Sequence, residues 1–175
     1  MKRDYIEWQD RSVALGYLIT FRCFGTWLHG DERGSVARRC SNIVGNPKIK
    51  PTDTLRQMDA ERLTAPPMKL GAVERKIVER AIREVCLARG YTLIAINVRT
   101  NHVHVVVNNC GKPERMMDSF KAYSTRALRA ANLIGPETKP WSRHGSTRYL
   151  WTEEHIGQAV EYVVNGQGGE LPTFD

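Results

Sequence analysis

The histidines at positions 102 and 104 are the residues of this chain whose types and spacing point most directly to chemistry. They open a run of valines, which predicts a β-strand. Side chains two residues apart in a strand face the same side, so His102 and His104 would point into one space, about 7 Å apart. Two imidazoles in this arrangement form half of a divalent-metal site. The alternative is that both are half-buried and only form hydrogen bonds with neighbouring groups.

Hydrophobic periodicity predicts the elements that must position these histidines. In chain order we expect a strand within 13–28, a helix over 72–89, strands over 91–98 and 102–107, a helix from 113 or 114 to about 131, a strand over 147–151 and a helix over 153–164. Thr152 would cap the last helix, and the proline-containing stretch 132–145 would be irregular. We therefore predict an α+β protein with a ferredoxin-like βαββαβ core, whose antiparallel sheet has two helices on one face.

The chain has 175 residues, which fits a single domain, 1–175, with a sizeable core. Residues 30–70 are rich in glycine and proline and predict an irregular excursion, with a short helix near 53–63. Residues 146–165 would add a C-terminal strand and helix to the core. An excursion of this length is uncommon unless it binds something.

The charge balance favours a polyanionic partner. The chain has 26 lysines and arginines against 19 aspartates and glutamates, a formal net charge of +7. Nucleic acid is the commonest partner of such proteins, although a basic soluble protein need not bind any. The four cysteines form no CxxC pair, and neither a signal peptide nor a membrane-spanning run is evident. We expect a cytoplasmic protein with reduced thiols and no membrane partner.

Cations alternate with aromatic residues over 139–151, a pattern typical of surfaces that bind single-stranded nucleic acid through phosphates and stacked bases. The candidates for DNA contact there are Trp141, Arg143 and Arg148. Lys121 and Arg126, on the preceding helix, are two more. The alternative is that the tryptophans pack this segment against the core.

The chain resembles a known family at these residues. His102-Val103-His104 matches the histidine-hydrophobe-histidine signature of the HUH endonucleases, and Tyr123 lies on the next helix, where the single-tyrosine transposases have their nucleophile. The resemblance is to insertion-sequence transposases of this kind and their REP-associated relatives. It spans most of residues 13–165.

The resemblance implies a metal-dependent endonuclease and strand transferase that acts on single-stranded or hairpin DNA, usually as a homodimer. His102 and His104 would hold Mg²⁺ or Mn²⁺ at the scissile phosphate. Tyr123 would attack the phosphorus and form a 5′-phosphotyrosine intermediate. By periodicity alone, however, Tyr123 could also be a core aromatic residue, and Tyr149 and Tyr162 are rival nucleophiles.

The chain also departs from the family pattern. The glutamine that supplies a third metal ligand one turn after the tyrosine is replaced by Ala127. Possible substitutes are Asn97, Glu153, Glu154 and His155. This departure favours an alternative function, a domesticated protein that binds single-stranded or hairpin DNA with little or no cleavage. A third possibility is a metal-dependent phosphohydrolase without a tyrosine intermediate.

Overall fold

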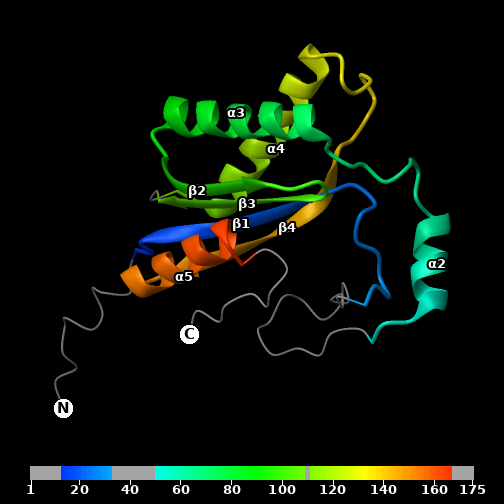
Figure 1. Ribbon diagram of the computed structural model, residues 1–175, viewed down its shortest axis with the longest axis horizontal. Helices are drawn as coiled ribbons and strands as arrows, with labels where there is room; N and C mark the ends of the chain where they lie inside the picture. Colours follow the sequence, from blue (N-terminus) through cyan, green and yellow to red (C-terminus); the bar gives the residue numbers. More distant parts are fainter. Residues whose placement is uncertain (1–12, 33–49, 109–110, 167–175) are drawn as a thin grey trace.

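The computed structural model describes residues 13–32, 50–108 and 111–166 (Figure 1). Their elements, in chain order, are β1 (Gly16–Cys23), α2 (Asp53–Glu61), α3 (Ala72–Arg89), β2 (Thr92–Val98), β3 (His102–Asn108), α4 (Pro113–Ala130), β4 (Trp141–Leu150) and α5 (Glu153–Val164). None of these helices is long and apolar enough to cross a membrane.

The four strands form one antiparallel sheet in the order β2-β3-β1-β4, which confirms the predicted α+β fold. Figure 1 shows α3 and α4 on one face of the sheet and α5 on the other. The connections β1-α3-β2 and β3-α4-β4 each join parallel strands but run in opposite directions across the sheet. Right-handed crossovers therefore bring α3 and α4 to the same face.

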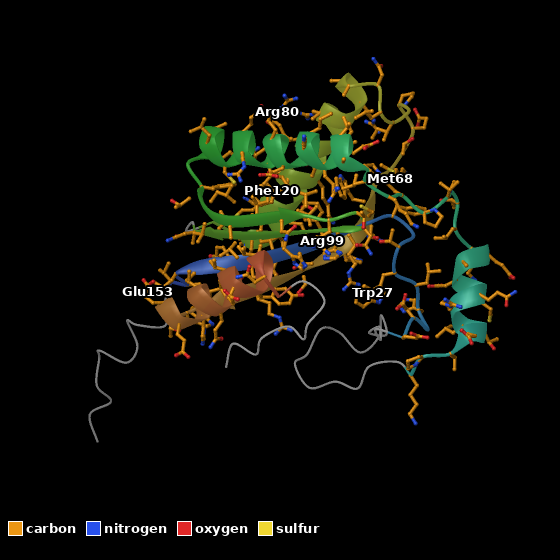
Figure 2. The ribbon with its side chains drawn as sticks, in the orientation of Figure 1. Trp27, Met68, Arg80, Arg99, Phe120 and Glu153 are labelled. Carbon is orange, nitrogen blue, oxygen red and sulfur yellow. The ribbon has the colours of Figure 1, made fainter. Side chains whose placement is uncertain are left out.

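The sheet separates two apolar clusters. The larger lies between the strands and the layer of α3 and α4, where Phe120 is fully buried (Figure 2). Within β3, Val103, Val105 and Val107 belong to this cluster, whereas Val106 packs in the smaller cluster beneath α5. The alternation of a strand therefore assigns the odd-numbered residues of β3 to the α3–α4 face and the even-numbered ones to the α5 face.

The prediction that residues 132–145 are irregular is wrong for their last part, because β4 begins at Trp141. Trp141 lies opposite Cys23 and packs edge-on against Phe21, with ring centroids 5.1 Å apart. A break in the β1–β4 register between Phe21 and Cys23 accommodates the extra residues of β4. Pairing with β1 thus extends β4 into a segment whose own composition predicts no strand, and no local sequence pattern indicates this pairing.

Part of the predicted excursion packs against the loop that follows β1. Gly25 has a φ of 69°, and a Cβ there would lie 3.1 Å from the Pro67 Cα. The backbone amide of Met68 donates to the Phe24 carbonyl at 2.9 Å. The predicted short helix is confirmed as α2, which stands beside the sheet in Figure 1. Residues 33–49 of the excursion lie outside the described residues.

Candidate functional site

The two histidines share one face of the sheet, as the sequence predicted, and this face is the one that α5 covers. His102 and His104 have the parity of Val106, which packs beneath α5, and their ring centroids are 4.7 Å apart. His104 is buried, with 4% of its surface exposed, and His102 is half-buried. The odd-numbered valines of β3 hold the strand in the core, so the imidazoles are left facing the opposite side.

Each imidazole has a hydrogen bond at Nδ1 that orients its ring. His102 Nδ1 lies 2.6 Å from Asn101 Oδ1, and His104 Nδ1 lies 2.7 Å from Thr20 Oγ1. An amide oxygen only accepts hydrogen bonds, so His102 Nδ1 donates its proton, and in the neutral ring Nε2 would carry the lone pair. The Thr20 hydroxyl can either accept a hydrogen bond from His104 Nδ1 or donate one to it, depending on the tautomer of the ring. Ligating histidines in proteins are held by such bonds at the other ring nitrogen.

The electrostatic surroundings keep His104 neutral. Burial, the largest cause, and the neighbouring His102, Arg22 and Arg99 together lower its pKa to about 3. A neutral imidazole is the form that ligates a metal ion. The donor set therefore fits a divalent cation: His102 and His104 would hold it, and two ligands leave positions open for phosphate oxygens.

Tyr162, near the end of α5, is the tyrosine beside this pair. Its ring centroid lies 5.3 Å from that of His104, and the rings meet edge to face. Asn97 is the β2 residue opposite His104, and its Nδ2 donates to the Val163 carbonyl at 2.8 Å. Val163, a residue of α5, is itself fully buried in the smaller cluster. These contacts fix the last turn of α5, and therefore Tyr162, over the histidines.

Tyr123 lies on the other side of the sheet. It is on α4, which buries Phe120, Ser124 and Leu128 toward the α3–α4 face, and 41% of its own surface is exposed. Its ring packs under the Arg126 guanidinium, 5.0 Å from the ring centroid. Within one chain, Tyr123 therefore does not reach the histidines. The position of α4 therefore separates Tyr123 from the histidines of the same chain, and its role as the nucleophile stays a prediction.

A sequence signal for this arrangement was present. If α3 and α4 both cover the valine face of β3, the histidines must face away from α4. Only a further helix on the opposite face can then bring a tyrosine to them, and the C-terminal helix predicted over 153–164 contains Tyr162.

Comparison with protein-family models matches residues 70–163 to the family described as "Transposase IS200 like". The chain belongs to the IS200-like transposase family. The resemblance drawn from His102-Val103-His104 is thereby confirmed at the family level. Curated protein sequences give no match.

Two solved structures are similar to this IS200-like transposase. One is a REP-associated tyrosine transposase bound to a REP hairpin: it is 13% identical with a TM-score of 0.49, and the match covers 93% of this chain and 68% of that one. The other is a protein of Deinococcus radiodurans R1 that is described as a transposase. It is 14% identical with a TM-score of 0.43, and the match covers 97% of this chain and 98% of that one.

Two of the DNA-contact candidates of this IS200-like transposase are built into its fold. The Trp141 indole is buried, and its Nε1 donates to the Lys121 carbonyl and to Thr125. The Lys121 ammonium donates to three consecutive β4 carbonyls, those of residues 142–144, and burial lowers its pKa. Both side chains therefore have partners inside the protein, and their contact with DNA stays a prediction.

The other three candidates lie at the surface in different places. Arg143 is exposed on β4, and Arg126 is exposed on α4 beside Tyr123. Arg148 lies opposite Leu18 of the smaller cluster, which places it on the same face as the histidines. Of the five candidates, the half-buried Arg148 is the one that the β1–β4 register places on the face of the histidine pair.

No third acidic, cysteine or histidine side chain groups with the two histidines in the described part of the chain. Residues 13–32, 50–108 and 111–166 contain no group of three such side chains that could hold a metal ion. Glu153, Glu154 and His155 open α5, about 10–13 Å along the helix axis from Tyr162. Asn97 is the only one of the four suggested substitutes that lies opposite His104.

Proposed function

We propose that this protein is a metal-dependent DNA endonuclease and strand transferase in which Tyr162 is the nucleophile. The observation that carries the proposal is the edge-to-face contact of the Tyr162 and His104 rings on one face of the sheet. A nucleophile must lie within reach of the group that polarises the scissile phosphate. Tyr162 meets this requirement within one chain.

The reaction is a transesterification. The Tyr162 phenolic oxygen attacks the scissile phosphorus, a tyrosyl O–P bond forms and the P–O3′ bond breaks. The phenol proton leaves to solvent, and the departing 3′ oxygen takes up a proton. The 5′-phosphotyrosine conserves the bond energy, so attack by a 3′-hydroxyl rejoins the strand without ATP.

A free phenol ionises near pH 10, so attack at neutral pH requires positive charge beside the oxygen. A divalent cation on His102 and His104 would supply such charge and polarise the phosphate. Imidazole ligands favour Mn²⁺ over Mg²⁺, which prefers oxygen. We therefore propose Mn²⁺ or Mg²⁺ as the cofactor, with higher activity in Mn²⁺.

The test is covalent capture of DNA. The full chain is incubated with single-stranded and hairpin oligonucleotides and Mn²⁺ or Mg²⁺, and protein–DNA adducts are resolved on a denaturing gel. Tyr162→Phe should abolish the adduct, and Tyr123→Phe should retain it. Both variants remove one hydroxyl from an α-helix, so each controls for the other. Loss of the adduct in Tyr123→Phe alone would overturn the assignment.

A second candidate function is binding of single-stranded or hairpin DNA with little or no cleavage. It is favoured by the absence, among the described residues, of a third acidic, cysteine or histidine ligand near the pair. This function predicts oligonucleotide binding that falls steeply with salt. It also predicts no adduct from the wild-type protein with either metal.

We also propose that the protein acts as a homodimer, as its family usually does. Light scattering of the full chain tests the stoichiometry. Mixing His102→Ala with Tyr162→Phe protein tests whether the site is shared. If the tyrosine of one copy served the histidines of the other, the mixture would regain adduct formation; the contact within one chain predicts that it does not.

A further inference from the structure

Two arginines flank the histidine pair. Arg22 lies directly opposite His102 in the β1–β3 register and therefore on the same face of the sheet. Arg99 begins the turn before β3, and its backbone amide donates to the His102 carbonyl at 2.8 Å. Both guanidinium charges are close enough to His104 to disfavour its protonation. The described part of this site therefore has two cations and two imidazoles, without a carboxylate grouped with the histidines.

Trp27 fixes the position of Arg22. The Arg22 guanidinium carbon lies 3.0 Å from the centroid of the Trp27 ring, a close cation–π contact. The loop that carries Trp27 is tied to the histidine strand, because the Thr26 hydroxyl donates to the Cys23 carbonyl at 2.9 Å and the Cys23 amide donates to Asn101 at 2.8 Å. Figure 2 shows Trp27 and Arg99 at the same end of the sheet.

A planar guanidinium that lies over an indole keeps its N–H groups in its own plane, directed outward. There they can donate hydrogen bonds to the oxygens of a phosphate. A metal site built for Mg²⁺ alone would be expected to have carboxylate ligands. This site instead has two guanidinium groups beside the imidazoles, which favours an anion next to the histidine pair.

We infer that Arg22, positioned by Trp27, and Arg99 form a clamp that binds one DNA phosphodiester at the histidine pair. The inference rests on the proposed function and deepens it, because it assigns the residues that hold the reacting phosphate. Arg22 and Arg99 contact the non-bridging oxygens, and Trp27 acts through Arg22.

The experiment measures binding separately from cleavage. A set of single-stranded oligonucleotides, each with one neutral methylphosphonate in place of one phosphate, is titrated against full-length Tyr162→Phe protein. The same scan is repeated after adding Arg22→Ala, Arg99→Ala, Trp27→Leu or Arg80→Ala. Arg80 is the matched control: it is an exposed arginine on α3, 3.9 Å from Glu84, on the opposite face of the sheet.

In the parent protein, one methylphosphonate position should weaken binding by about tenfold, the value of one charge-assisted contact. Arg22→Ala should remove the penalty at that position and leave the others. It should also lower the slope of log affinity against log salt by about 0.7, the contribution of one phosphate on a single strand. Arg99→Ala should reduce the same penalty, whereas Arg80→Ala should change neither quantity.

Trp27→Leu distinguishes positioning from general folding. It preserves the charge of Arg22, so the salt slope should stay near the parent value while the penalty at the clamped position falls. Thermal melting of each variant reports whether the fold is kept. If the penalty at every position is unchanged in Arg22→Ala, or if Arg22→Ala behaves like Arg80→Ala, the clamp is wrong.

The failure of the clamp and the failure of the proposed function give different results. If the wild-type protein and Arg22→Ala form the DNA adduct equally well, the clamp is overturned and the proposed nuclease function is preserved. Protein that forms no adduct, yet loses one position-specific penalty in Arg22→Ala, preserves the clamp in a DNA-binding protein.

Discussion

Thr20→Val tests whether the hydrogen bond behind His104 prepares this histidine as a ligand. The Thr20 hydroxyl lies 2.7 Å from His104 Nδ1, and His104 has only 4% of its surface exposed. Valine has nearly the same shape as threonine and suits a strand, so the substitution removes the hydroxyl and little else. The buried Nδ1 is then left without its partner.

The expected cost follows from this burial. Leaving a buried polar atom unsatisfied costs about 1–3 kcal/mol. With a central value of about 2 kcal/mol, Tm should fall by about 4–8 °C in a protein of this length. Loss of the bond that orients a ligating histidine should also weaken Mn²⁺ binding by about 10–100-fold.

The assay combines thermal melting in chelator with calorimetric titration of Mn²⁺. Thr20→Ser is the matched control, because it keeps the hydroxyl and loses a methyl group. Thr20→Ser should retain Mn²⁺ affinity, although it melts somewhat below wild type. Equal Mn²⁺ affinity in Thr20→Val and Thr20→Ser would refute the role of this hydrogen bond. Wild-type protein that binds no Mn²⁺ would refute the metal site itself.

Three further predictions concern stability and are checked by thermal or denaturant unfolding. The Ser124 hydroxyl is buried without a hydrogen-bond partner among the described residues, so Ser124→Ala should stabilise the protein by about 1 kcal/mol; a lower Tm would contradict this. A Cβ at Gly145 would lie 2.5 Å from the Thr20 carbonyl oxygen and would meet the Met117 sulfur, so Gly145→Ala should cost about 1–3 kcal/mol; unchanged stability would show that β4 can shift. Lys121→Met keeps the side-chain stem but loses three bonds to β4 carbonyls, and it should cost about 2 kcal/mol, whereas a neutral result would mean that water replaces the ammonium.

The local elements of this protein were predictable because local sequence specifies them. The three-to-four spacing of apolar residues gave the helix Ala72–Arg89 with its observed ends, and Gly90 adopts the left-handed conformation expected after a helix. Glu153–Val164 was predicted in the same way, with Thr152 accepting a hydrogen bond from the His155 amide. Both signals act within one or two helical turns, so they do not depend on the rest of the chain.

The histidine half of the candidate site was predictable for a related reason. The two-residue repeat of a strand determines that His102 and His104 share a face, whatever packs against them. Which tyrosine lies beside the histidines was not predictable in this way. Tyr123 and Tyr162 both lie on amphipathic helices. The apolar stripe of such a helix shows that the helix packs against the sheet, but not against which face of the sheet.

The sequence by itself determined the type and extent of most elements, the shared face of the two imidazoles and the excess of positive charge. Only the tertiary structure decided that α4 packs with α3 on the valine face of β3 and that α5 crosses the histidine face. The physical reason is that burial of an apolar stripe is non-directional. The handedness of the crossovers and the bond from Asn97 to Val163 bring Tyr162, rather than Tyr123, to His104 within one chain.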